Sequence, residues 1–250
     1  MNKNSSSTLY GRGVFSTISV FDNRPFVWAK HWRRLTANAE KLGIDISDYN
    51  ERSVADSLAE LIEKNGIRNG LARITFSDDS PSELWSEGGE KKTRLSIITT
   101  SRRGLPEHFK LTVSPHHINT TSTLVGIKSC NYLEHLMAFD EAKSRGFHEA
   151  IRMNERGDVA SGCLANVFWL KDEKLFTPSL KTGCLAGTTR EFVLENLECE
   201  EVETGIDAVH EADKIFLTSA GIGIVRVAMF ESRRIDEAEH PIMSLLPRKD

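Results

Sequence analysis

Short apolar segments bounded by turn residues recur along almost the whole chain, and only a few longer segments have the period of a helix. Apolar residues with helical spacing occur at about residues 30–42 and 53–64, from about residue 131 onward and after residue 189. Strands are expected at residues 14–21, 26–28, 71–76, 95–100, 111–113, 149–153, 166–171, 174–177, 200–203, 214–218 and 224–230. Short helices separated by many strands predict an α+β fold with two lobes.

The length of 250 residues is enough for one large domain or for two modest ones. The segment from Arg102 to Pro106 contains glycine and proline and has the composition of a linker. We therefore expect a small N-terminal domain at residues 1–102, a linker at residues 103–108 and a larger C-terminal domain at residues 109–250.

The overall charge and the cysteine pattern argue against several classes of partner. A net charge of −4 gives no electrostatic reason to expect a nucleic acid or an anionic membrane. The four cysteines show no CxxC pair, so they are expected to be reduced thiols in a cytoplasmic protein. The sequence shows no signal peptide and no apolar run long enough to span a membrane. His116 and His117 have no third ligand at metal-binding spacing, so no metal site is expected.

A lone lysine, Lys128, follows the mostly apolar residues 124–127 and precedes a predicted helix. Asn131 and Glu134 have the spacing of a capping box at the start of that helix. The apolar face of the helix is expected to be Leu133, Leu136, Met137 and Ala142. Partial burial at a strand-to-helix junction would lower the pKa of the Lys128 amine and make it nucleophilic enough to form a Schiff base. From this segment alone, an ordinary surface lysine at a helix start explains the pattern better.

Two turns rich in small residues are candidate anion sites. Residues 183–190 run into a helix whose first amides, dipole and two threonine hydroxyls suit a phosphate. Residues 218–221 follow an apolar strand and offer further amides. An ordinary capped helix and a plain turn between strands explain the same residues. Arg33 and Arg34 point about 100° apart on their helix, so one is expected to face the protein, where a phosphate would justify its burial.

The order and spacing of these features resemble those of one known family. The matching segments are its tyrosine-glycine-any-glycine motif at Tyr10–Gly13, its histidine-any-any-arginine-leucine helix at His31–Leu35, its lysine motif at Lys128–Asn131 and its phosphate loop at Gly187–Arg190. From Tyr10 to about Phe230 the chain is similar to the class IV aminotransferases, the fold type IV enzymes of pyridoxal 5′-phosphate (PLP). The resemblance implies a two-domain fold with the cofactor in the cleft between the domains, a small-molecule amino substrate and a homodimer.

The resemblance also implies a role for each matched residue. Lys128 would be the catalytic lysine that forms a Schiff base with PLP, Arg34 would bind the PLP phosphate, and Thr17 would lie near the substrate. The other cofactor contacts implied are Ser161, Leu185, Gly187, Thr188, Thr189, Ser219 and Ala220. Among them, Leu185 would pack against the ring and Ser161 would face the pyridine nitrogen, while the remaining residues would surround the phosphate.

Family membership does not decide the reaction, because the family contains branched-chain and D-amino acid aminotransferases as well as 4-amino-4-deoxychorismate lyase. The lyase releases pyruvate and forms 4-aminobenzoate for folate biosynthesis. After Phe15 the aminotransferases usually carry glutamate, whereas this chain has Ser16 and Thr17. Residues 165–169 are close to the sequence that the lyases have in the corresponding strand. Residues 77–92 lack the arginine-any-histidine set of the D-amino acid aminotransferases. The lyase is therefore the leading expectation, and an aminotransferase is the second.

Ser161 is the largest departure from the family pattern. Aligned through residues 166–168, it replaces a glutamate that keeps the pyridine nitrogen protonated. A serine hydroxyl can only hydrogen-bond a neutral nitrogen, which should impair reversible transamination more than a prompt elimination. Ser161 therefore favours lyase chemistry further, and it is also consistent with a PLP-binding protein of reduced activity. Arg12, where the family often has aspartate, has no interpretation from the sequence.

Overall fold

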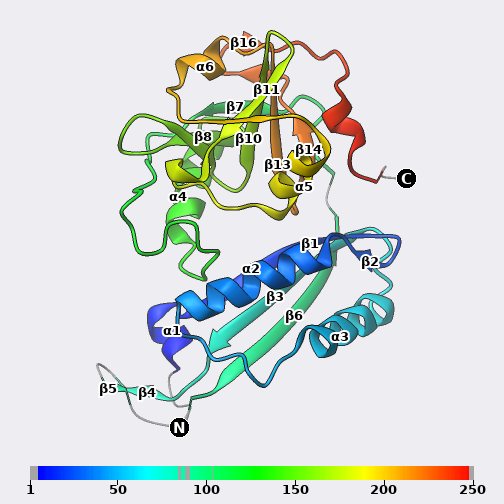
Figure 1. The fold of residues 1–250 in the computed structure, drawn as a ribbon, viewed down its shortest axis with the longest axis vertical. Helices are drawn as coiled ribbons and strands as arrows, with labels where there is room; N and C mark the ends of the chain where they lie inside the picture. Colours follow the sequence, from blue (N-terminus) through cyan, green and yellow to red (C-terminus); the bar gives the residue numbers. More distant parts are fainter. Residues whose placement is uncertain (1–4, 84–85, 88–90, 103, 248–250) are drawn as a thin grey trace. The chain divides into compact units, whose positions relative to one another are not determined.

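Figure 1 shows the computed structural model of the chain, which describes residues 5–83, 86–87, 91–102 and 104–247. The chain divides into two compact units. Unit 1 contains Met1–Arg103 and Ile127–Tyr132, and unit 2 contains Gly104–Gly126 and Leu133–Asp250. The Lys128 segment therefore belongs with the N-terminal part of the chain. The predicted domain bounds place residues 127–132 in the C-terminal domain, whereas here they belong to unit 1.

Unit 1 is built on an antiparallel sheet with the strand order β2-β1-β3-β6. Its strands are β1 (Gly13–Phe21), β2 (Arg24–Pro25), β3 (Gly70–Asp78) and β6 (Thr93–Ser101). Two helices, α2 (Trp28–Lys41) and α3 (Glu51–Lys64), pack on one face of this sheet (Figure 1). Val14 and Ile18 of β1 join Leu35 and Leu58 of the helices in one buried core. Because side chains alternate along a strand, Phe15 and the other odd-numbered residues of β1 lie on the opposite face.

Residues 127–132 run beside β1 and complete unit 1. The Phe15 amide donates to the Lys128 carbonyl at 3.0 Å, and the Cys130 amide donates to the Gly13 carbonyl at 2.8 Å. Ser129 forms an antiparallel bridge with Val14 between these two hydrogen bonds. The backbone of Lys128 is therefore fixed directly against β1.

The edges of unit 1 differ from the sequence expectations. A tight turn at Asp22 and Asn23, both with positive φ, leads into the two-residue strand β2, and α2 begins within the predicted strand at residues 26–28. The first described residues form a short helix, α1 (Ser6–Tyr10), capped by the Ser5 hydroxyl. The segment at residues 77–92, between β3 and β6, contains β4 (Ser82–Glu83) and β5 (Ser86–Glu87), and its residues 84–85 and 88–90 lie outside the described residues.

Unit 2 contains two five-stranded sheets with the orders β12-β11-β10-β13-β14 and β16-β15-β7-β8-β9. The first sheet comprises β10 (Asn166–Lys171), β11 (Lys174–Pro178), β12 (Glu200–Val202), β13 (Lys214–Ser219) and β14 (Gly223–Arg226). The second comprises β7 (Lys110–Val113), β8 (Glu149–Met153), β9 (Val159–Gly162), β15 (Met229–Phe230) and β16 (Arg233–Arg234). Leu111 and Ile151 of the second sheet share a buried core with Val167, Trp169 and Leu217 of the first.

The helices of unit 2 are α4 (Leu133–Ser144), α5 (Thr188–Asn196) and α6 (Asp207–His210), with short 3₁₀ turns η1 (Leu180–Thr182) and η2 (Pro241–Ser244). The buried residues of α4 are Ala138 and Ala142, whereas Leu133, Leu136 and Met137 are exposed. The predicted apolar face of α4 is therefore wrong except at Ala142. The two alanines pack against Ala150 and Cys163, and their small side chains allow the helix to approach the sheet closely.

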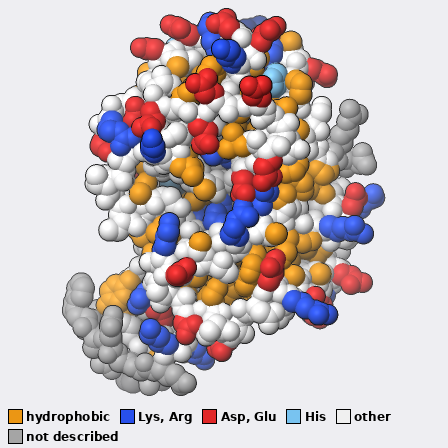
Figure 2. Space-filling view, viewed as in Figure 1, with side chains coloured by type: hydrophobic (Ala, Val, Ile, Leu, Met, Phe, Trp, Pro, Cys, Tyr) orange, Lys and Arg blue, Asp and Glu red, His pale blue; other side chains and the backbone are white. Residues whose placement is uncertain are grey.

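The observed sheets and helices confirm the α+β class. The predicted strand at 224–230 is instead two strands, β14 and β15, which belong to different sheets, and β9 was not predicted. No helix in the described ranges combines the length and the hydropathy of a membrane span. Acidic and basic side chains are interspersed over the face shown in Figure 2, in keeping with the small net charge.

Candidate active site

Lys128 lies in residues 127–132, the segment of unit 1 that runs beside β1, and is partly buried. Its amine donates a hydrogen bond to the Tyr132 hydroxyl at 3.0 Å. The same nitrogen lies 4.5 Å from the ring centroid of Phe15 and 4.5 Å from that of Tyr132. The two rings meet edge to face with their centroids 5.1 Å apart. Two aromatic side chains thus confine the amine and shield it from water.

The local structure around Lys128 differs from the predicted strand-to-helix junction. Residues 123–126 form turns, not a strand, and α4 begins only at Leu133. The predicted capping box is also wrong. The side-chain amide of Asn131 donates to the Gly11 carbonyl at 3.1 Å, and Glu134 pairs with Arg152.

The electrostatic surroundings lower the pKa of Lys128 to about 7. Burial is the largest cause, and the positive charges of Arg34 and Arg73 add to it. Arg73 comes from β3, and its guanidinium carbon stands 3.6 Å from the ring centroid of Phe15. With this pKa, about half of the amines are unprotonated at neutral pH. Lys128 can therefore act as a nucleophile or a base without a strong partner base.

Arg34 is turned inward, whereas Arg33 is exposed, as the helical spacing predicts. The Arg34 guanidinium donates to the Ser16 hydroxyl at 2.8 Å, and the same hydroxyl lies 2.7 Å from Nδ1 of His31. The pKa of buried His31 is well below its usual value because of burial and the charges of Arg34 and Lys128. The Ser16 hydroxyl and the neutral His31 ring thus orient the Arg34 guanidinium. Neither group carries a negative charge that would offset the charge of Arg34.

Thr17 is the register partner of Arg73 in the β1–β3 ladder. It shares the sheet face of Phe15 by strand alternation. The structure therefore places three residues expected in the site, Lys128, Arg34 and Thr17, within unit 1.

The predicted phosphate loop lies in unit 2 at the start of α5. Thr188 and Thr189 are buried and open the helix, and Gly187 is its N-cap residue with no side-chain hydrogen bond. A Cβ atom on Gly187 would lie 2.0 Å from the Asn166 side-chain oxygen, so a larger residue would displace the Asn166 side chain or the helix start. Asn166 also donates to the Leu185 carbonyl at 2.9 Å. One asparagine of β10 thus holds this loop against the sheet.

The second predicted turn lies beside the first. Asn166 is the register partner of Thr218, which directly precedes Ser219 and Ala220 at the end of β13. The Ser219 hydroxyl accepts the Ile222 amide at 3.4 Å. The Thr218 hydroxyl is fully buried and has no hydrogen-bond partner within the described part of the chain. A buried hydroxyl of this kind is unusual and suits a ligand that accepts a hydrogen bond.

Ser161 is buried on β9, in unit 2, and its hydroxyl donates to the Gly162 carbonyl at 2.7 Å. Both oxygens of a nearby carboxylate, that of Glu149, bind backbone amides. This carboxylate accepts the amides of Ala150, Cys163 and Leu164 at 2.8 to 3.0 Å. Burial nevertheless raises the pKa of Glu149. Glu149 therefore supports the turn after Ser161 and offers no free oxygen in place of the expected glutamate.

Sequence reasoning missed several residues of these clusters. Arg73 was only one residue of a predicted strand, and Tyr132 was part of a helix start. The contact between Ser16 and His31 and the buried Thr218 hydroxyl are not visible in the sequence. Of these contacts, only the one between Lys128 and Tyr132 joins residues close in sequence, four positions apart. The other contacts join distant segments.

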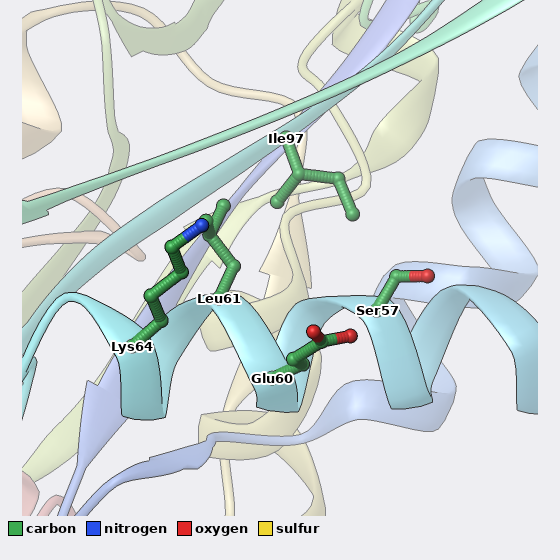
Figure 3. A pocket seen from close by; sticks show the side chains of 5 residues that line it. All are labelled: Ser57, Glu60, Leu61, Lys64 and Ile97. Atoms are coloured by element: carbon green, nitrogen blue, oxygen red, sulfur yellow. The ribbon is translucent and has the colours of Figure 1, made fainter.

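Other features of the molecule do not add to the site. A surface hollow in unit 1 is lined by Ser57, Glu60, Leu61, Lys64 and Ile97, from α3 and β6 (Figure 3). None of the residues expected in the site lines it. In the described ranges, no three histidine, cysteine or acidic residues gather as metal ligands.

Comparison with known proteins identifies the family. The profile of the family described as Amino-transferase class IV matches residues 13–230. The chain belongs to this class IV aminotransferase family. The motif resemblance is thereby confirmed, and so is the two-domain fold type IV architecture.

Relatives of this class IV family member carry out different reactions. The aminodeoxychorismate lyase of Bacillus subtilis is 30% identical over 232 residues, covering 89% of this chain and 79% of the lyase. The D-alanine aminotransferase of Bacillus licheniformis is 26% identical, covering 90% of this chain and 81% of that enzyme. The crystal structure of the branched-chain aminotransferase of Thermoproteus uzoniensis with norvaline superimposes with a TM-score of 0.88 at 25% identity, covering 96% of this chain and 85% of that chain.

Proposed function

We propose that this class IV family member binds PLP and acts as a 4-amino-4-deoxychorismate lyase, which forms 4-aminobenzoate and pyruvate. The observation that carries the proposal is the Lys128 amine, whose pKa is lowered to about 7 between two aromatic rings and two arginines. Such an amine is suited to covalent binding of an aldehyde and to proton transfer near neutral pH.

The residues of both units fit the chemistry of PLP. In unit 1, Lys128 would bind the aldehyde and Arg34 would bind the phosphate. In unit 2, the amides at Thr188 and Thr189 and the unpartnered Thr218 hydroxyl are donors suited to phosphate oxygens. When bound, PLP supplies electron withdrawal from the carbons next to the substrate amino group. The location of the cofactor between the two domains stays a prediction.

Lys128 would carry the proton transfers of the elimination. Its amine takes a proton from the ring carbon of the substrate, and the C–O bond to the enolpyruvyl group breaks with the electron pair leaving on oxygen. The ring becomes aromatic, which yields 4-aminobenzoate. Lys128 then returns the proton to the departing enolpyruvate, which becomes pyruvate. A pKa of about 7 suits both directions of transfer at neutral pH.

Arg73 is proposed to bind a carboxylate of the substrate. Its guanidinium lies over Phe15 and affects the pKa of Lys128. It is also the register partner of Thr17, the residue expected near the substrate. The substrate carries two carboxylates, so a fixed arginine near the reacting amine would orient it.

Several observations favour the lyase over an aminotransferase. Ser16 contacts Arg34 where aminotransferases usually carry glutamate, and Ser161 replaces the glutamate expected at the pyridine nitrogen. The relatives from B. subtilis and Vibrio harveyi, 30% and 27% identical, are both aminodeoxychorismate lyases. Amino acid transamination is the second candidate, supported by the D-alanine and branched-chain aminotransferase relatives.

The decisive experiment supplies PLP-loaded protein with 4-amino-4-deoxychorismate and no keto acid. We expect equal amounts of pyruvate and 4-aminobenzoate, and borohydride treatment should attach PLP to Lys128. Lys128→Ala should abolish both results. Lys143→Ala, which removes an exposed lysine of α4, is the matched control and should change neither.

Other outcomes point to the alternatives. An aminotransferase would convert bound PLP to its amine form when given an amino donor and would release no pyruvate from the lyase substrate. A protein that binds PLP but leaves every donor unchanged would be a binding protein of reduced activity. Labelling of a different lysine by borohydride would contradict the proposed site.

The homodimer and the cytoplasmic location are part of the same proposal. The family resemblance supports the homodimer, and the four cysteines, all free thiols in the structure, support the cytoplasmic location. Light scattering on the purified protein tests the dimer, which predicts twice the chain mass of 28.0 kDa.

A further inference from the structure

Arg152 is a buried charge that the proposed function has not yet used. It lies on β8 in unit 2 with no exposed side-chain surface. Its guanidinium donates to the carbonyls of His116 and His117 at 3.0 and 2.6 Å and pairs with the Glu134 carboxylate. It also lies 3.2 Å from Nδ1 of His135. These contacts fix the guanidinium in one position between a loop and the start of α4.

Arg152 lies directly opposite Ser161 in the antiparallel β8–β9 ladder. Opposed residues of such a ladder share one sheet face, with Cβ atoms about 4.5–5.5 Å apart. A bulge follows this pair, so the register is specific to it. Ser161 is therefore the neutral neighbour of a buried cation.

Two carboxylates near this pair already have partners, namely those of Glu149 and Glu134. Glu149 directs its carboxylate to the backbone amides of the turn after Ser161. Glu134 reaches Arg152 from α4, and two thirds of its side chain is exposed to solvent. Arg152 also acts electrostatically on Cys163, two residues beyond Ser161. The face around Ser161 therefore offers a hydroxyl and a buried guanidinium, whose counter-ion Glu134 is largely exposed to solvent.

We infer that Arg152 and Ser161 form a matched pair, an inference that rests on the proposed function. The pair keeps a heteroaromatic ring nitrogen that binds against Ser161 in its unprotonated form. A neighbouring cation disfavours protonation of such a nitrogen, and the Ser161 hydroxyl can rotate to donate to it. Arg152 is a positioning residue in this pair. Because of it, a carboxylate introduced at position 161 would pair with the guanidinium and would not reach the ligand.

This pair has a consequence for the substrate class of the site. An unprotonated ring withdraws electrons weakly, so the site suits substrates that expel a leaving group together with loss of the proton. It is poorly suited to reactions that must store the electron pair on the ring, such as reversible transamination. The pair therefore favours elimination, independently of the residues around Lys128.

The test measures the ring-nitrogen NMR chemical shift of isotopically labelled PLP bound to the protein. The wild type should show the shift of an unprotonated pyridine nitrogen. In Ser161→Glu the shift should still be that of an unprotonated nitrogen, because Arg152 would pair with the new carboxylate. Combining Ser161→Glu with Arg152→Gln should move the shift to that of a protonated nitrogen. Glutamine keeps a donor for the His116 or His117 carbonyl while removing the charge.

The matched control combines Ser161→Glu with Arg145→Gln. Arg145 also anchors a backbone carbonyl in unit 2, that of Val113, but does not oppose Ser161. This control should behave as Ser161→Glu alone. A protonated nitrogen in the wild type or in Ser161→Glu alone overturns the inference, as does an unprotonated nitrogen in the double variant with Arg152→Gln. If that double variant does not fold, the wild type and Ser161→Glu still decide.

Failure of the proposed function has a different signature. A wild-type protein that binds no PLP, or binds it away from Lys128, contradicts the proposed function and the inference together. PLP bound to Lys128 with a protonated ring nitrogen contradicts the inference alone.

Discussion

The acidity of Lys128 depends on side chains from three segments that are distant in sequence. Arg34 on α2 and Arg73 on β3 add positive charge, and Phe15 on β1 limits access of water. None of these contributions is visible in the sequence around residue 128, where an ordinary surface lysine was the better explanation. The reactivity of this residue is therefore a property of unit 1 as a folded body.

The hydroxyl of Ser16 offers a direct test of this electrostatic account. It accepts a hydrogen bond from Arg34 at 2.8 Å. Ser16→Glu would place a carboxylate beside Arg34 and offset its charge, so the pKa of Lys128 should rise, with an increase of about tenfold in proton affinity. The measurement is the pH dependence of Lys128 labelling by an amine-reactive reagent, followed by mass spectrometry in protein without PLP.

A matched control exists on the same strand. Ser19 accepts a hydrogen bond from Arg102 at 2.9 Å, and Arg102 is not among the charges that affect Lys128. Ser19→Glu should therefore leave the labelling profile of Lys128 unchanged. Equal shifts in the two variants would show that Arg34 does not set the pKa of Lys128.

At the scale of elements, the start of α5 depends on the fit between Gly187 and Asn166. Gly187→Ala would bring its Cβ to 2.0 Å from the Asn166 side-chain oxygen, so the helix start or the Asn166 side chain must move. We expect a loss of about 1–3 kcal/mol in the free energy of unfolding. We also expect weaker binding of PLP, because the amides at Thr188 and Thr189 would shift.

Urea unfolding and a PLP titration measure these two effects. The control is Gly205→Ala, where the nearest atom to a new Cβ is the Gly157 carbonyl oxygen at 3.7 Å, an ordinary contact. Gly205→Ala should change neither stability nor PLP binding appreciably. Unchanged PLP binding in Gly187→Ala would argue against a role for this loop in holding the phosphate.

Most of the strands and the long helices could be predicted, because β1, β3, α2 and α3 have clear apolar periodicity. The elements that were missed lack such a signal. β9 consists of Val159-Ala160-Ser161-Gly162, which is short and rich in small residues, although it carries Ser161. In α4 the spacing indicated a helix but not its buried side, since two alanines form the contact and the larger residues are exposed.

The candidate site was predictable to the extent that motifs record it. Lys128, Arg34 and the loop at Gly187 follow from matched motifs, whereas Arg73, Tyr132 and Arg152 do not. Arg152 illustrates the reason: its importance comes from the strand register that sets it opposite Ser161, and register is a tertiary property. Residues whose role depends on cross-strand neighbours cannot be recognised before the sheets are known.

At the scale of the whole molecule, the chain leaves unit 1 and returns to it only to deliver residues 127–132. Folding of unit 1 therefore includes partial burial of the Lys128 amine beside two arginines. Unfolding restores the ordinary pKa of 10.5, whereas the folded chain holds a pKa of about 7. Between these two values the unfolded state binds more protons than the folded state, so this group makes stability rise with pH.

This linkage predicts a specific pH profile for protein without PLP. Lys128→Met removes the titrating group, so it should be more stable than the wild type at and below pH 7, by an amount on the order of 5 kcal/mol if the whole pKa difference is realised. The advantage should shrink steadily as the pH rises toward 10.5, because the wild-type amine becomes neutral in both states. Urea unfolding at a series of pH values gives the difference between the two proteins. Lys143→Met, at an exposed position on α4, should track the wild type throughout. A Lys128→Met difference that stays constant with pH would mean that the folded protein does not lower the pKa of this amine, and the nucleophile required by the proposed chemistry would be lost with it.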